Sequence, residues 1–318
     1  MLGSGGMEKR ENKASEGGDP KRRRRRRTIL VAAVMVALIV VALGLWARWR
    51  PAKTFVPGPP GEDQLRVVTW NVGYFTTRHV KAARAADTDA IVAVLCQTNA
   101  HLIALEELGS KEQAEEIARG LGAGWNAHGT ATGHPGQFLG ALSRLPVLSA
   151  EQKEAGGKKM LGLCVQLGGG RKAFLLSMHA PLPLQDKTEA LDYIRTGAGW
   201  TRERSEDVRI MAGDLNWNFR LTNDDAKTDD LYREIRSFCA DGTAAIGPSF
   251  YAHTRIDHVF YAPEGLRVVA SGCGIIDPPD RYLRVPGWRD HRPVVVTIRL
   301  PEGSLRGNAD AETHRGAR

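Results

Sequence analysis

The sequence has 318 residues, 42% hydrophobic and 25% charged, which suits a globular domain with a sizeable core rather than a low-complexity chain. Its formal net charge of +8 is typical of a chain that binds nucleic acid or membranes, but residues 1–53 carry 13 of the 44 Lys and Arg residues against 4 of the 36 acidic ones. Residues 54–318 therefore have a net charge of −1. The positive charge of the whole chain is thus no evidence that the folded domain binds nucleic acid.

Residues 1–27 predict a disordered, basic, cytoplasmic tail that ends in the run KRRRRRR. The stretch 29–46, ILVAAVMVALIVVALGLW, has no charge and would span roughly 27 Å as a helix. We therefore expect a transmembrane anchor at 28–47, with Trp46 and Trp49 at the membrane interface. Because basic charge is much heavier before this segment than after it, the positive-inside rule predicts a single pass with the following domain exported, periplasmic or extracellular.

Other interpretations fit the same stretch. Ala42-Leu43-Gly44 has the small-x-small pattern of a signal-peptide cleavage site, although the apolar region is long for that role. Residues 26–30 loosely match a twin-arginine export signal. A buried helix of a soluble domain is disfavoured because six arginines directly precede it.

The segment 48–63 contains PGPPG and predicts a stiff linker, 64–300 a folded domain, and 301–318 a disordered tail. Many strands with interspersed helices predict two sheets packed together with helices outside. Helices are expected at 85–97, 111–121, 188–193 and 225–238. Strands are expected at 65–71, 101–106, 137–148, 162–166, 172–179, 208–212, 255–261, 266–269 and 294–300.

The four cysteines have no CxxC spacing, which disfavours a zinc site. Cys96 lies in an expected helix and Cys164 in an expected strand, so we expect buried free thiols there. An exported domain would allow a disulfide between Cys239 and Cys273, and the sequence leaves this pairing open.

Polar side chains recur where the expected strands end. They are Asn71, Glu106, Glu107, His179, Asp214, Asn216, Asp257, Asp290 and His291. Taken singly, an asparagine after a strand is usually a turn residue, and a lone histidine is usually structural. Asp257 lies between Ile256 and Val259, where burying a carboxylate is costly unless a partner such as a histidine is present. The set forms one site only if the strands converge.

Six motifs contain these residues: VVTWN at 67–71, LIALEEL at 102–108, SMHAP at 177–181, GDLN at 213–216, RIDHVF at 255–260 and RDHRPV at 289–294. In this order they resemble the endonuclease/exonuclease/phosphatase superfamily, metal-dependent phosphodiesterases that include DNase I-like nucleases and neutral sphingomyelinases. The resemblance covers about 65–300. It implies an α+β fold of two packed, mainly antiparallel β-sheets flanked by helices, the four-layer DNase I-like sandwich.

The resemblance also implies a metal site. Glu107 falls where the family's glutamate holds the divalent metal, Asn71 matches the amide that supports metal and phosphate, and Asp290 matches a metal-side carboxylate. Hard oxygen ligands of this kind suit Mg²⁺, Mn²⁺ or Ca²⁺. Glu106 takes the position of a neighbouring glutamine in the family.

The catalytic roles follow from the same resemblance. His291 matches the catalytic histidine, with Asp257 fixing its tautomer. Asp214 and Asn216 match the pair that positions the attacking water and the phosphate, and His179 matches a histidine that donates to a phosphate oxygen. Whether Asp214 or His291 is the general base is left open. His101 and Arg289 depart from the family's usual residues, at positions outside the catalytic set.

We therefore expect a membrane-anchored, exported, metal-dependent phosphodiesterase, monomeric and without an obligate protein partner, that hydrolyses a phosphoester by in-line attack of water. DNA or RNA is the first expected substrate. A sphingomyelinase- or phosphoinositide-type lipid phosphoesterase is the alternative, and a non-catalytic binding module on the same fold is a further one. Trp217 and Phe219 would either contact substrate or pack in the core. Lys158-Lys159 and residues 202–204 would form either local basic patches or ordinary solvated surface.

Overall fold

The computed structural model describes residues 34–36, 39, 55–73, 81–133, 135–183, 187–219, 226–250, 254–263, 265–276, 291–302 and 304–305, without the side chains of 81–87 and 226–229. The chain divides into two compact units, Met1–Pro51 and Ala52–Arg318. In the first unit only 34–36 and 39 are described, as exposed helical residues. The expected tail 1–27 and the rest of the expected span 28–47 lie outside the described residues. The part of the chain that the structure describes holds no helix with the length and hydropathy of a membrane span.

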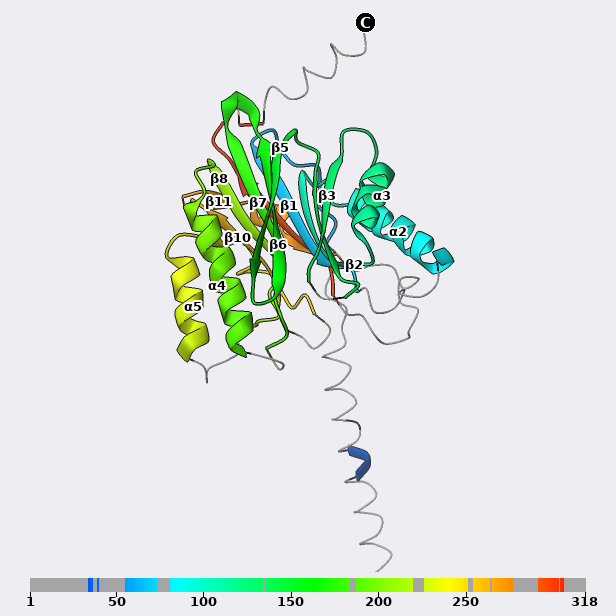
Figure 1. Cartoon of the computed structure of the whole chain (residues 1–318), viewed down its shortest axis with the longest axis vertical. Coiled ribbons are helices and arrows are strands. Elements are labelled where there is room, and N and C mark those ends of the chain that lie inside the picture. The colour runs from blue at the N-terminus through cyan, green and yellow to red at the C-terminus, as the bar shows by residue number, and fades with distance from the viewer. Residues whose placement is uncertain are drawn as a thin grey trace, which may run out of the picture. The chain divides into compact units, whose positions relative to one another are not determined.

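The second unit contains two β-sheets (Figure 1). The first has the order β11 (Arg267–Val268), β13 (Val294–Arg299), β1 (Gln64–Asn71), β2 (Leu102–Leu108), β4 (Phe138–Ser143), β3 (Asn126–Ala131), with β12 (Gly274–Ile275) paired to β13. The second has the order β5 (Val147–Ala155), β6 (Lys158–Gln166), β7 (Lys172–His179), β8 (Val208–Asp214), β10 (Asp257–Ala262), β9 (Ala240–Asp241). Most neighbouring strands are antiparallel, but β1–β2 and β7–β8 are parallel, so both sheets are mixed.

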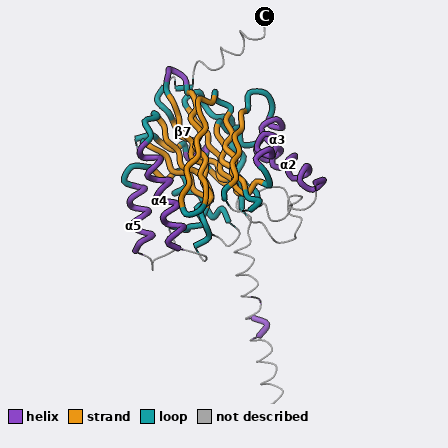
Figure 2. The backbone as a smooth tube through the Cα atoms, viewed as in Figure 1, coloured by secondary structure: helices purple, strands orange, loops and turns teal. Residues whose placement is uncertain are grey.

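Helices cover the outer face of each sheet (Figure 2). The helices α2 (Lys81–Cys96) and α3 (Lys111–Leu121) pack on the first sheet, and α4 (Lys187–Glu203) and α5 (Ala226–Arg236) on the second. Apolar clusters fill the space between the sheets and the space under each helix pair. This arrangement confirms the expected pair of packed sheets flanked by helices.

The helix α3 begins and ends where the sequence predicts. Ser110 caps it, since its hydroxyl oxygen accepts a hydrogen bond from the backbone N–H of Gln113. Gly122 ends it with φ 108°, a value that favours glycine. Ala114 and Ile117 are buried against the first sheet, which matches the helical spacing of the apolar residues.

Some element boundaries differ from the sequence prediction. The single strand expected at 137–148 is divided between β4 and β5, and β5 continues to Ala155. Most side chains of β5 are exposed, and the apolar residues of VLSAEQKEA do not alternate with polar ones in a way that would predict a strand. The short strands β3, β9 and β12 were not predicted. The helix α4 is longer than expected, because the glycines 197 and 199 weaken its helical pattern without ending it.

Segments beside the predicted domain limits also contact the folded unit. In the expected linker, the backbone N–H of Phe55 donates to the carbonyl of Ile275, and the carbonyl of Gly58 accepts from the Arg66 side chain. In the expected tail, Ser304 is buried and accepts a hydrogen bond from the side chain of Arg171. The packed region therefore extends beyond 64–300 on both sides.

All four cysteines are free thiols. Cys164 is buried as expected, whereas Cys96, at the end of α2, is exposed, which corrects the expectation of a buried thiol. Cys239 and Cys273 form no disulfide with each other.

Candidate active site

The polar residues predicted from the sequence gather at one end of the layer between the two sheets. In β1, Leu65 and Val67 belong to the apolar inter-sheet cluster, and the next residues on the same face are Thr69 and Asn71. The other central strands change in the same way, with inward rows Leu102-Ala104-Glu106 in β2, Ala173-Leu175-Ser177-His179 in β7 and Val208-Ile210-Ala212-Asp214 in β8. Each row is apolar along the strand and polar at its carboxyl end.

Strand register aligns these polar ends. Asn71 pairs with Glu106 in the parallel β1–β2 ladder, and His179 pairs with Asp214 in the parallel β7–β8 ladder. Asp214 also pairs with Asp257 at the start of antiparallel β10. Strand ends therefore position most of these side chains, while Asn216 follows β8 and His291 precedes β13.

Asp214 lies at the centre of the group and is almost fully buried. Its Oδ2 accepts a hydrogen bond from Nδ2 of Asn71 at 3.0 Å, and its Oδ1 accepts from the backbone N–H of Asn216 at 2.7 Å. The residue before it, Gly213, has φ 150°, and a Cβ there would lie 1.9 Å from the carbonyl oxygen of Met178. Only glycine allows β8 to approach β7 this closely where the carboxylate enters the site.

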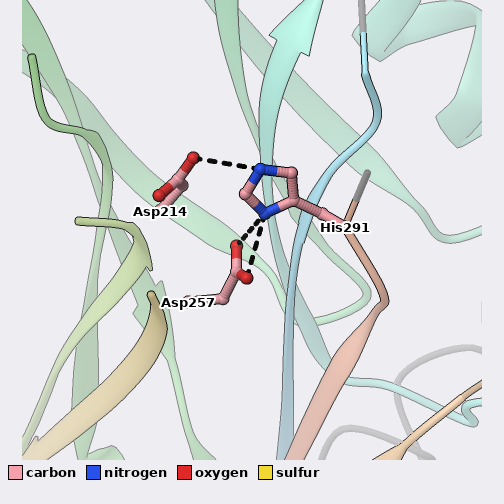
Figure 3. A group of neighbouring side chains, drawn as sticks. All are labelled: Asp214, Asp257 and His291. Carbon is pink, nitrogen blue, oxygen red and sulfur yellow. Dashed lines mark hydrogen bonds and ion pairs between the residues drawn. The ribbon is translucent and has the colours of Figure 1, made fainter. Parts of the chain in front are cut away.

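His291 lies between two carboxylates (Figure 3). Its Nδ1 is 3.0 Å from both carboxylate oxygens of Asp257, and its Nε2 is 3.5 Å from Oδ2 of Asp214. Asp257 is fully buried and also accepts a hydrogen bond from the hydroxyl of Ser249. This geometry lets an Nδ1–H of His291 donate to Asp257 and leaves Nε2 facing Oδ2 of Asp214, where a favourable contact needs a proton on one of the two atoms.

His179 approaches the same carboxylate from β7. Its Nε2 lies 3.7 Å from Oδ2 of Asp214 and 3.6 Å from Oε1 of Glu107. Glu107 has φ 56°, a left-handed backbone that is uncommon for a non-glycine residue, at an irregularity of the β2–β4 register. Strain of this kind concentrates at functional positions because the surrounding structure must hold it in place.

The two amides complete the arrangement. Asn216 has φ 51°, and its Nδ2 donates to the carbonyl of Ala180 at 2.9 Å. The Oδ1 of Asn71 accepts from the backbone N–H of Gly73 at 3.0 Å, so this amide is fixed from both ends. Together they orient the polar groups around Asp214.

Four buried carboxyl groups meet here: Glu106, Glu107, Asp214 and Asp257. Burial raises the pKa of Asp214, an effect that Asp257 strengthens and His291 opposes. Burial also holds the pKa of Glu106 well above its usual range, with Asp257 and Asp214 contributing. The site therefore carries more potential negative charge than its own residues neutralise.

The donors fit a divalent cation. The Oε1 of Glu106 accepts from the hydroxyl of Thr69 at 3.0 Å, while its buried Oε2 has no hydrogen-bond partner among the described residues. Carboxylate and amide oxygens suit Mg²⁺, Mn²⁺ or Ca²⁺, so Glu107 and Asn71 could hold such an ion. Asp290, the third predicted ligand, lies outside the described residues. Asp214, Asp257 and His291 also bring ligand atoms within 4.8 Å of one another and could hold a metal, although the 3.0 Å contacts favour a hydrogen-bonded Asp257–His291 pair.

The sequence model of the Endonuclease/Exonuclease/phosphatase family matches residues 68–293. The chain belongs to this family. No curated protein sequence matches it.

Solved structures share the family fold. An endonuclease/exonuclease/phosphatase from Beutenbergia cavernae DSM 12333 is 21% identical with a TM-score of 0.58, over 76% of this chain and 72% of that one. D. rerio TDP2 in complex with a single-strand DNA product is 17% identical with a TM-score of 0.57, over 74% of this chain and 98% of that one. Humanized D. rerio TDP2 with 14 mutations is 16% identical with a TM-score of 0.56, over 74% and 99%. At these identities the likeness shows the fold.

The structure thus brings together seven of the eight predicted residues: Asn71, Glu107, His179, Asp214, Asn216, Asp257 and His291. Sequence reasoning missed Thr69 and Ser249, the hydroxyl partners of Glu106 and Asp257. Thr69 could have been found, because it precedes Asn71 by two residues on the same strand face. Ser249 lies in an irregular segment that gives no such signal.

Three residues considered as substrate contacts belong to the interior. Trp217 and Phe219 are buried in the cluster under α4 and α5, where Phe219 stacks on Tyr232 with ring centroids 5.1 Å apart. Lys158, considered as part of a basic surface patch, is also buried. For Trp217 and Phe219, the core-packing interpretation is the one that agrees with the structure.

Proposed function

We propose that this chain is a divalent-metal-dependent phosphodiesterase. The observation that carries the proposal is the convergence of two imidazoles on one carboxylate, with Nε2 of His291 and of His179 at 3.5 and 3.7 Å from Oδ2 of Asp214. In-line attack of water on a phosphoester needs both neutralisation of the phosphate charge and removal of a proton from the water. Hydrogen-bond donors and a base that lie this close together suit both tasks.

The residues divide this work by position. A water molecule beside Asp214 and Nε2 of His291 gives its proton to one of them as its oxygen attacks phosphorus, and the ester oxygen leaves with a proton from solvent or the site. The Nδ1 contact with Asp257 holds the His291 tautomer and stabilises the imidazolium. His179, when its Nε2 carries a proton, donates to a phosphate oxygen. A divalent cation bound by Glu107 and Asn71 would supply positive charge against the phosphate oxygens.

The first proposed substrate is DNA or RNA. D. rerio TDP2, which shares the fold, has been solved in complex with a single-strand DNA product, and this supports a nucleic-acid phosphodiester as substrate. A phospholipid headgroup is the second candidate, favoured by the apolar sequence 28–47, which we propose anchors the exported domain to a membrane. The burial of Trp217 and Phe219 removes one argument for base stacking.

The test is a substrate panel with the purified full chain in detergent. Plasmid DNA, RNA, sphingomyelin, a phosphoinositide and bis(p-nitrophenyl) phosphate are incubated with Mg²⁺, Mn²⁺ or EDTA, beside His291→Ala. Metal-dependent turnover that disappears in His291→Ala supports the proposal, and the best substrate separates nuclease from lipase. A folded wild-type chain that hydrolyses none of these would contradict it and favour a non-catalytic binding module on the same fold.

A further inference from the structure

Lys158 is a buried lysine beside the proposed active site. It is the first residue of β6, follows the Gly156-Gly157 turn, and is 5% exposed. A lysine next to Lys159 would ordinarily lie on a solvated surface. Its ammonium instead lies under the end of β7, where His179 enters the site.

The ammonium contacts backbone rather than acids. Nζ of Lys158 donates to the carbonyls of His179 and Ala180, each at 3.4 Å. No carboxylate of the described residues forms a salt bridge with it within 4.0 Å. Burial lowers the pKa of this ammonium, and the more distant Asp214 and Glu107 partly offset that effect. Among the described residues this buried cation has two hydrogen-bond partners, both carbonyls at long distance. Burying a cation with so few partners reduces folding stability, which points to a use other than stability.

The carbonyls that Lys158 holds connect two predicted catalytic residues. The carbonyl of Ala180 also accepts the hydrogen bond from Nδ2 of Asn216 at 2.9 Å, and the backbone N–H of Ala180 donates to the carbonyl of Asp214. The His179–Ala180 peptide is therefore held by Lys158 on one side and by the Asp214–Asn216 segment on the other.

We propose that Lys158 is a positioning residue of the active site, which fixes the His179–Ala180 peptide and, through the carbonyl of Ala180, the amide of Asn216. The expected effect of Lys158 on turnover rests on the proposed phosphodiesterase function. The expected effect of Lys158 on the geometry of His179 does not, and it can be measured separately.

The first experiment compares Lys158→Met with wild type and with Lys172→Met, a matched change at an exposed lysine at the start of β7. In Lys158→Met we expect kcat to fall about 10- to 100-fold, KM to change less than threefold, and Tm to stay equal or rise. Lys172→Met should match wild type. Unchanged kcat in Lys158→Met, or a fall in Tm that accounts for the lost activity, would overturn the proposal.

Chemical rescue tests whether the charge, rather than the volume, matters. Lys158→Ala leaves space for n-propylammonium, which supplies the missing chain and charge, whereas n-propanol supplies the chain with a neutral end. Recovery of at least fivefold in kcat with n-propylammonium alone supports the proposal. Equal recovery with n-propanol, or none with either, would overturn it.

A readout independent of hydrolysis separates this inference from the proposed function. In the full chain with ¹⁵N-labelled histidine, the imidazole resonances of His179, assigned with His179→Gln, should shift or broaden in Lys158→Met and not in Lys172→Met. If wild type hydrolyses no phosphodiester, the proposed function fails and these resonances still decide the role of Lys158. Unchanged His179 resonances in Lys158→Met would overturn it.

Discussion

Two buried polar clusters lie at opposite ends of β1, and they are built differently. At its start, Arg66 donates to the hydroxyl of Thr297 and to the carbonyls of Gly58 and Thr98, and its own backbone N–H donates to Nδ1 of His101, all at 2.8–3.0 Å. At its end, Nδ1 of His291 lies 3.0 Å from Asp257, but the Nε2 atoms of His179 and His291 lie 3.5–3.7 Å from the carboxylates of Glu107 and Asp214.

The two clusters differ in how completely their polar groups are satisfied. The Arg66 cluster satisfies its groups at ordinary hydrogen-bond distances, as buried polar groups usually do. The Asp214 cluster gathers four carboxyls and leaves Oε2 of Glu106 without a hydrogen-bond partner among the described residues. A buried carboxylate oxygen without a partner is a group that an incoming cation would use.

The largest expected effect is on turnover at the Asp214 end. Asp214→Asn keeps the shape of the side chain but cannot accept a proton as the carboxylate does. We expect kcat/KM to fall about 10³-fold, while Tm stays equal or rises because a costly buried carboxylate is removed. Kinetics and thermal melts of the same preparation check this. A large fall in Tm with normal turnover would place Asp214 among the structural residues.

At the other end of β1 the expected effect is on stability. Arg66→Met leaves the hydroxyl of Thr297 and the carbonyls of Gly58 and Thr98 without this donor. We expect a loss of about 3 kcal/mol and a Tm lower by about 6–12 °C, with kcat per folded molecule unchanged. Turnover that falls more than the folded fraction would remove the contrast between the clusters.

Acid should destabilise the Arg66 cluster through His101. Burial, with Arg144 and Arg66, lowers the pKa of His101 from 6.5 to about 4 in the folded state. The unfolded chain therefore binds more protons between these values, so stability is complete above pH 6.5 and declines as pH falls toward 4.

His101→Asn should remove that pH dependence, because its amide oxygen can accept from Arg66 without titrating. Between pH 7 and 4.5 we expect the Tm of the variant to fall by about 4–8 °C less than the Tm of wild type, a difference equivalent to roughly 2 kcal/mol. Melting curves across this pH range measure it. Parallel curves for variant and wild type would show that His101 does not titrate in this way.

The smallest effect concerns Glu106, the least satisfied member of the Asp214 cluster. Glu106→Gln retains an acceptor for Thr69 and removes a buried carboxyl whose pKa is held high. We expect Tm to rise by about 2–4 °C, or roughly 1 kcal/mol, and the metal concentration for half-maximal activity to increase less than threefold. A fall in Tm would show that the acid itself stabilises the fold.

Much of this site follows from strand alternation and motif order. The residues of β1, β7 and β8 were predictable because each strand is apolar on its inward face until its last polar residues. The side-chain partners of Glu106 and Asp257, the burial of Lys158 and the exposed strand β5 were not, since they depend on contacts between segments distant in the sequence. Asp290 and most of 28–47 remain predictions, because they lie outside the described residues.

The most direct test of the Asp214 cluster is hydrolysis of bis(p-nitrophenyl) phosphate by the full chain against Mn²⁺ concentration, for wild type and Glu107→Gln. We predict that wild-type activity saturates with Mn²⁺ concentration, that EDTA abolishes it and that added Mn²⁺ restores it. Glu107→Gln should need about 10- to 100-fold more Mn²⁺ for half-maximal activity. Hydrolysis that survives EDTA, or the same Mn²⁺ dependence in both proteins, would contradict a metal-dependent phosphodiesterase centred on these residues.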